Sequence, residues 1–208
     1  ITLNQKGIKM LNIIKSYWYE LKTEYENRYN KPFLKDFETS KEYLERMKSY
    51  LLKKQSECPS NVDVVCTLAS VELELRDEEF DYIEFLQDFL NEFENSLSDI
   101  DKAIIYTNLA FWDDFSKNSL KYFNLAKDLN SPFVETYTGL GLYYFSEYEY
   151  SKDEKVLSIS HNYFKTAREM EQSYVTAFNF AVSLFELKEY EKSKEIFLKR
   201  QIKYLGWL

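Results

Sequence analysis

The side chains that could perform catalysis or bind a metal are few and scattered in this sequence. His161 is the only histidine, so a histidine-based metal site or a histidine-assisted nucleophile would depend on this one residue. It stands between Ser160 and Asn162 within a helical pattern, which favours a surface or interhelical histidine. The acidic pairs Glu78–Glu79 and Asp113–Asp114 have no nucleophile and no second ligand set beside them. Solvated carboxylates are therefore expected.

Two glycines, Gly139 and Gly141, stand inside one apolar helical pattern, although a helical glycine costs about 1 kcal/mol relative to alanine. The pair lacks the preceding strand, the third glycine and the following acidic residue of a dinucleotide site. Close helix packing is the better explanation for Gly141, whereas either a neighbouring helix or a bound peptide would approach Gly139. We expect no enzyme, no metal and no cofactor; an enzyme whose site lacks every family motif is the alternative.

The composition favours long helices joined by short turns. Only 3 prolines and 4 glycines occur, and Leu, Lys, Glu, Tyr and Phe dominate. Aromatic residues make up 18% of the chain, which argues against disorder although 30% of the residues are charged. The chain is long enough to bury a substantial core.

The expected location is cytoplasmic, without membrane contact. The sequence shows neither an apolar run of about 18 residues nor a positively charged and apolar leader before the first helix. Residues 1–9 are interpreted as upstream sequence, with Met10 as the candidate start. Cys58 and Cys66 match no zinc motif and are expected to be reduced, a single disulfide in a secreted protein being the alternative.

Apolar residues spaced three and four apart predict an all-α fold of ten helices in five antiparallel pairs. Residues 1–56 are expected to form an N-terminal helical pair. Residues 57–208 are expected to form helical repeats, in one continuous domain with that pair. The predicted helices cover about residues 8–30, 40–56, 62–75, 78–96, 100–115, 117–129, 132–148, 155–171, 173–187 and 189–204.

Small residues recur at related positions of the predicted pairs. Ala69, Ala110, Gly141 and Ala181 are separated by 41, 31 and 40 residues. In the last pair, large and small residues follow the spacing of a tetratricopeptide repeat: Phe180, Ala181, Leu184, Tyr190, Ser193 and Phe197. Residues of about 100–204 therefore resemble a tetratricopeptide-repeat (TPR) protein, which implies a right-handed superhelix of helix-turn-helix repeats. A helical bundle without a groove is the alternative.

This resemblance implies a binding surface, because the first helix of each pair lines a concave face in TPR proteins. The positions of this chain that would lie there are Asn108, Phe111, Thr138, Leu142, Phe145, Phe178, Asn179, Val182 and Phe185. Asn108 and Asn179 stand where the family often uses asparagine to hold a peptide backbone, a task that suits an amide because it both donates and accepts. In the alternative interpretation the aromatic residues are core and the asparagines lie on a wet surface.

The net charge of −8 is concentrated in one segment. Residues 57–101 carry 14 acidic side chains and one basic side chain, whereas residues 102–208 carry 14 of each. Helical spacing places four of these acids on one ridge: Asp81, Glu84, Asp88 and Glu92. The ridge is either a solvated helix face or a docking surface for a basic protein. Its sign disfavours direct binding of nucleic acid.

These observations predict a non-enzymatic protein that sequesters one protein or peptide partner. The acidic segment favours a basic partner, as in a bacterial immunity or antitoxin protein. A regulatory receptor that binds a signalling peptide in the concave face is the second hypothesis, based on Asn108 and Asn179. A scaffold in a larger assembly is the third, suggested by the apolar tail at residues 204–208. The oligomeric state stays open.

Overall fold

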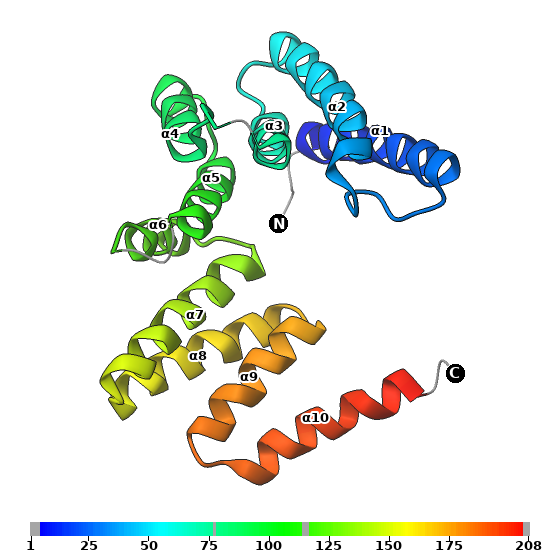
Figure 1. Cartoon of the computed structure of the whole chain (residues 1–208). Helices are drawn as coiled ribbons and strands as arrows, with labels where there is room; N and C mark the ends of the chain where they lie inside the picture. Colours follow the sequence, from blue (N-terminus) through cyan, green and yellow to red (C-terminus); the bar gives the residue numbers. More distant parts are fainter. Residues whose placement is uncertain (1–4, 77, 114–116, 206–208) are drawn as a thin grey trace. The chain divides into compact units, whose positions relative to one another are not determined.

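The computed structural model describes residues 5–76, 78–113 and 117–205. Within these ranges the chain forms ten α-helices and no strand, so the all-α prediction is confirmed. In chain order they are α1 (Gln5–Tyr29), α2 (Phe37–Glu57), α3 (Val62–Leu75), α4 (Tyr82–Phe93), α5 (Asp99–Trp112), α6 (Lys117–Asp128), α7 (Val134–Ser151), α8 (Glu154–Met170), α9 (Tyr174–Glu186) and α10 (Tyr190–Leu205). Figure 1 shows the helices in chain order, with a long loop between α1 and α2 and a tight connection between α7 and α8.

The helices form two compact units, Ile1–Asp101 and Lys102–Leu208. This division falls elsewhere than the predicted boundary after residue 56, because α3 packs against both α1 and α2 and shares their core. The expectation of one continuous domain stays a prediction.

Aromatic rings fill much of the first unit's core. Tyr25 and Tyr43 are fully buried and meet edge to face, with 5.4 Å between their ring centroids. Phe33 packs edge-on against the Tyr25 ring at 5.1 Å. At the end of α3, Arg76 adopts the left-handed conformation and places its guanidinium 4.6 Å from the centroid of the Phe37 ring. Ring packing of this kind adds about 0.5–1.5 kcal/mol per pair beyond area burial.

Helix α4 is shorter than the predicted 78–96. Asp81 is its N-cap, and the Asp81 carboxylate accepts a hydrogen bond of 2.9 Å from the backbone N–H of Glu84. A side-chain acceptor at this position satisfies one of the unpaired N–H groups of the first turn and so fixes where the helix begins. At the other end, the N–H of Ser96 bonds the carbonyl of Phe93 in a turn.

Helix α7 extends beyond the predicted residue 148 and ends at Ser151. Residues 149–151 thus lengthen this helix. Lys152 then takes the left-handed conformation and bonds back to the carbonyl of Tyr148. Asp153 caps α8 by accepting from the N–H of Lys155 at 2.8 Å.

Each of the two glycines of α7 packs against one phenylalanine ring of a neighbouring helix. A Cβ atom built on Gly141 would stand 2.4 Å from the ring of Phe164 in α8. A Cβ atom on Gly139 would stand 2.1 Å from the ring of Phe123 in α6. Both rings are buried. The packing role predicted for Gly141 is confirmed, and at Gly139 the approaching group is a neighbouring helix, not a bound peptide.

A hydrogen bond from a serine to a backbone carbonyl joins the two helices in each of the last two pairs. Ser160 in α8 donates to the carbonyl of Gly141 at 2.8 Å, and Ser193 in α10 donates to the carbonyl of Ala181 at 2.7 Å. Gly141 therefore corresponds to Ala181, and Ser160 corresponds to Ser193. Helix α9 packs against both members of the preceding α7–α8 pair, as α3 does on α1–α2.

We predict that Gly141→Ala destabilises the protein. The added methyl collides with the ring of buried Phe164, an overpacking cost of about 1–3 kcal/mol, and better helix propensity offsets only about 1 kcal/mol of it. Urea unfolding measures the change in unfolding free energy. Glu149→Ala, an exposed position of the same helix, is the control.

Combining Gly141→Ala with Phe164→Leu should cost less than the two single changes added together, because the smaller side chain relieves the collision. Strict additivity in this double-mutant cycle would contradict the Gly141–Phe164 contact.

Candidate functional site

The predicted binding residues lie in both units. The four acidic residues belong to the first unit, at the start and on the surface of α4. The predicted concave-face residues belong to the second unit, on α5, α7 and α9. Each unit therefore carries one candidate surface, and each is described by itself.

The acidic residues of α4 present one exposed face. Glu84, Asp88 and Glu92 are exposed on the helix, and exposed Asp81 caps it. Within residues 5–76, 78–113 and 117–205, none of these four carboxylates forms an ion pair. Asp81 already accepts the N–H of Glu84, which gives it a structural task that the other three do not share.

The predicted residues of α5 and α7 are mostly part of the packed interior. Phe111 meets buried Phe123 edge to face, with 5.2 Å between centroids, and Thr138 is buried. The side-chain amide of Asn108 donates to the carbonyl of Ile104 in its own helix at 2.9 Å. Leu142 and Phe145 are half-buried. These positions offer little open surface to a partner.

Helix α9 is different, because its large apolar residues are open to solvent. Phe178 is 44% exposed and Phe185 is 56% exposed. Tyr174 stacks on Phe178 and is itself exposed, as is Val175. The two other predicted residues of this helix, Asn179 and Val182, are half-buried.

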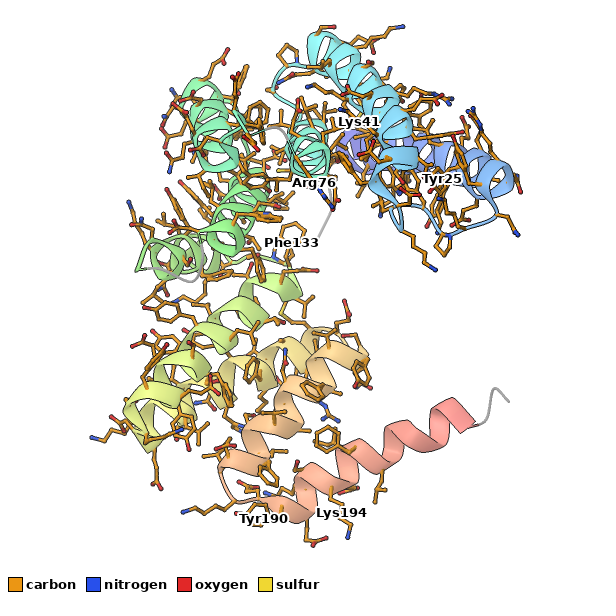
Figure 2. The ribbon with its side chains drawn as sticks, viewed as in Figure 1. Tyr25, Lys41, Arg76, Phe133, Tyr190 and Lys194 are labelled. Carbon is orange, nitrogen blue, oxygen red and sulfur yellow. The ribbon has the colours of Figure 1, made fainter. Side chains whose placement is uncertain are left out.

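The exposed rings of α9 border a hollow of about 460 Å³, here called the α9–α10 groove. Figure 2 labels two of its residues, Tyr190 and Lys194, in the first turns of α10. Phe178 contacts Phe197 edge to face at 6.0 Å, and Phe185 contacts Tyr190 at 5.2 Å. The groove is lined by Phe185, Tyr190, Glu191, Ser193, Lys194, Phe197 and Leu198.

Sequence reasoning found one wall of this groove and missed the other. Phe185 was predicted as a binding residue, whereas Tyr190 and Phe197 were interpreted only as repeat positions, and Lys194 and Leu198 were not singled out. In the preceding pair, residues with this spacing are core. The spacing of these residues gave no signal that separates an exposed position from a core position.

The side chains considered for chemistry have structural surroundings. The Oγ of Ser183 donates to the carbonyl of Phe180 at 2.8 Å, so it accepts from Nδ1 of His161 at 2.9 Å. The His161 ring stacks on the ring of Phe180, which joins α8 to α9. Burial raises the pKa of Cys66 to about 12, and the carboxylates of Asp63 and Asp101 add to this. A thiol with a pKa this high is almost entirely protonated near neutral pH.

The described parts of the chain contain neither a cluster of metal ligands nor a membrane-spanning helix. No three or more His, Cys, Asp or Glu side chains gather there as metal ligands. No helix in those ranges combines the length and apolar character needed to cross a bilayer.

Comparison with known proteins identifies the fold. No protein-family model and no curated protein matches the chain. A crystal structure of MamA, which has a TPR-like fold, superposes with a TM-score of 0.52 at 18% identity, covering 78% of this chain and 93% of MamA. A second MamA crystal structure gives 0.49 at 17% identity, covering 86% and 90%. The first comparison confirms the predicted TPR-like helical-repeat fold.

We predict that His161 makes stability depend on pH. Burial is the main cause that lowers its pKa below the ordinary 6.5; Lys165 and Lys192 lower it further, and Glu189 opposes them. The unfolded chain then binds more protons, so this contribution to the unfolding free energy is present above about pH 6.5 and is lost as the pH falls through the folded pKa. Urea unfolding between about pH 5 and pH 8 measures it.

The control for this prediction is His161→Gln, which keeps an amide donor for Ser183 and removes the titration. The parent protein should lose more stability than the variant on acidification. Equal pH slopes for the two proteins would rule out the contribution of His161.

Proposed function

Proceeding from a TPR-like fold, we propose that this chain is a protein-binding module and that its partner docks in the α9–α10 groove. The observation that carries the proposal is the uncovered aromatic surface of the last helix pair. Phe178, Phe185 and Tyr190 are each about half exposed, and all three border or line the groove. Large apolar patches on a folded protein mark interaction sites, because water contact with them is unfavourable.

The chemistry of the groove suits a protein better than a small polar ligand. Its walls are rings and an aliphatic side chain, with Lys194 and Glu191 as its charged groups. Aromatic side chains are enriched at the centre of protein interfaces, where they contribute most of the binding energy. Lys194 and Glu191 lie 4.0 Å apart as an ion pair, so the charges of the lining balance each other and its apolar groups carry the proposed contact.

We predict that Phe185→Asp removes partner binding, since it places an unpaired charge in the apolar wall of the groove. Phe185 is more than half exposed, so the fold should tolerate the change. Affinity capture from the native cell, with the bound chain identified and its affinity then measured with purified proteins, should show a loss of at least about tenfold.

The matched control is Tyr150→Ser, which removes an exposed ring on α7 at 88% exposure, outside the groove lining. This variant should keep the parent affinity, and thermal melting should show both variants folded. Unchanged partner affinity in Phe185→Asp would overturn the proposed function.

A second candidate function is the sequestration of a basic protein by the acidic face of α4, as in an immunity or antitoxin protein. Three exposed carboxylates at helical spacing, without ion pairs among the described residues, favour it. Like charges on one helix face repel by a few tenths of a kcal/mol per close pair, and a basic partner would relieve this. Such a surface would act mainly on the association rate.

Charge reversal tests the second candidate. In the triple variant Glu84→Lys, Asp88→Lys, Glu92→Lys, the association rate with the captured partner should fall at least about tenfold at low salt, and the salt dependence should weaken. Asp81 is left intact, because it caps α4 and its loss would confuse binding with stability. An unchanged rate and salt dependence would exclude this surface.

A further inference from the structure

We propose that Glu189 is a pH-sensitive joint between α8 and the start of α10, and that its carboxylate exchanges its partner when His161 takes up a proton. At neutral pH the carboxylate pairs with Lys192 of α10. In mild acid it pairs with the imidazolium of His161 in α8. Because all three side chains belong to this chain, the joint works with or without the proposed partner.

The ring of His161 is held in place by two contacts with α9. Its Nδ1 lies 2.9 Å from the Oγ of buried Ser183, and the ring stacks on Phe180 with 5.0 Å between centroids. Since the hydroxyl of Ser183 already donates to the carbonyl of Phe180, it accepts from Nδ1. The neutral ring thus carries its proton on Nδ1, and the second proton enters at Nε2. Both contacts with α9 survive this step, so the ring stays where it is.

The charged groups around this ring include one acid. Burial is the main cause that lowers the pKa of His161; among the charged groups, Glu189 raises it, whereas Lys165 and Lys192 lower it. Arg168 of α8 lies 5.0 Å from the centroid of the phenyl ring on which His161 stacks, and it stays charged throughout. The hydroxyl and the phenyl ring that α9 contributes do not titrate. Glu189 is therefore the acceptor for the new N–H of the imidazolium.

The backbone fixes the position of Glu189 directly before α10. Its N–H donates to the carbonyl of Leu184 at 2.9 Å, and its carbonyl accepts from the N–H of Ser193 at 3.1 Å. Its Oε2 is a buried atom that lies 2.5 Å from Nζ of Lys192. The helix dipole favours a carboxylate at the start of a helix. Glu189 thus remains an ionised acceptor with one oxygen turned away from water, whichever cation it meets.

Lys192 is the partner that can be replaced. Its side chain is 72% exposed, and the same dipole disfavours a cation in the first turn of α10. An exposed lysine pair contributes little, because a long side chain loses rotamer freedom when it is held. The imidazolium of His161 avoids that cost, since its ring is already fixed. A proton on His161 therefore draws the carboxylate of Glu189 to α8 and releases Lys192 to water.

The exchange acts on a helix start that also lines the α9–α10 groove. Tyr190 and Ser193 belong to the first turns of α10 and are part of the groove lining. Acid would thus tie this wall of the groove to α8 through a charge-assisted hydrogen bond.

One NMR signal reports the state of the joint, because His161 is the only histidine of the chain. Titration of its imidazole signals in the purified 208-residue chain gives the pKa of His161 directly. Glu189→Gln should lower this pKa further, and Lys192→Gln should raise it. Both side chains are partly or largely exposed, so urea unfolding at about pH 8 should show both variants folded.

Lys165→Gln is the matched control. Lys165 also lowers the pKa of His161, but its ion pair, at 3.9 Å, is with Glu169 and not with Glu189. Its removal should raise the pKa of His161 through lost repulsion alone. When Glu189→Gln is added, the rise caused by Lys192→Gln should shrink by at least about half, because no carboxylate is left to exchange. The rise caused by Lys165→Gln should stay the same.

Two results would overturn the joint. An unchanged pKa of His161 in Glu189→Gln would exclude Glu189 as the acceptor. Equal effects of Lys192→Gln with and without Glu189 would make Lys192 a distant charge and rule out the exchange. Neither result touches the proposed function, which Phe185→Asp tests through partner affinity.

Discussion

The second unit depends on how closely α7 can approach its two neighbours. The ring of Phe123 in α6 packs against Gly139, and the ring of Phe164 in α8 packs against Gly141. Because neither glycine has a side chain, a ring can pack closely on each of two faces of α7. Close packing of this kind recovers dispersion energy that any void would lose. A hydrogen bond also joins the helices of each of the last two pairs: Ser160 donates to the carbonyl of Gly141, and Ser193 donates to the carbonyl of Ala181.

The α9–α10 pair has exposed apolar rings that no described helix covers. Helices α3 and α9 each pack on the helix pair that precedes them. Each of them buries an apolar surface that the preceding pair cannot bury alone. The α9–α10 pair carries the same apolar spacing without a helix on it among the described residues, and its rings stay open to water. The constraint that builds the stack thus also produces its candidate binding surface.

The fold was readable from the sequence, whereas the binding surface was readable only in part. Apolar spacing and the recurring small residues predicted ten helices and the TPR-like repeat, because both patterns are local. The predicted helix of residues 78–96 placed Asp81 in its interior, whereas in the structure Asp81 caps α4. The Asp81 carboxylate accepts a hydrogen bond from the backbone N–H of Glu84, which competes with continuation of the helix. Phe111 and Phe178 were both predicted to lie on the concave face, but only the structure shows one packed on Phe123 and the other exposed. The exposure of a residue depends on which neighbours cover it, and the spacing of apolar residues in the sequence does not predict those neighbours.

The most direct test compares two equivalent rings in the free protein. A soluble paramagnetic probe broadens the NMR signals of aromatic rings that water can reach. If the α9–α10 groove is open and is the binding surface, the signals of Phe197 broaden while those of Phe164 do not, and bound partner protects Phe197. Equal protection of Phe164 and Phe197 in the free chain would contradict the account.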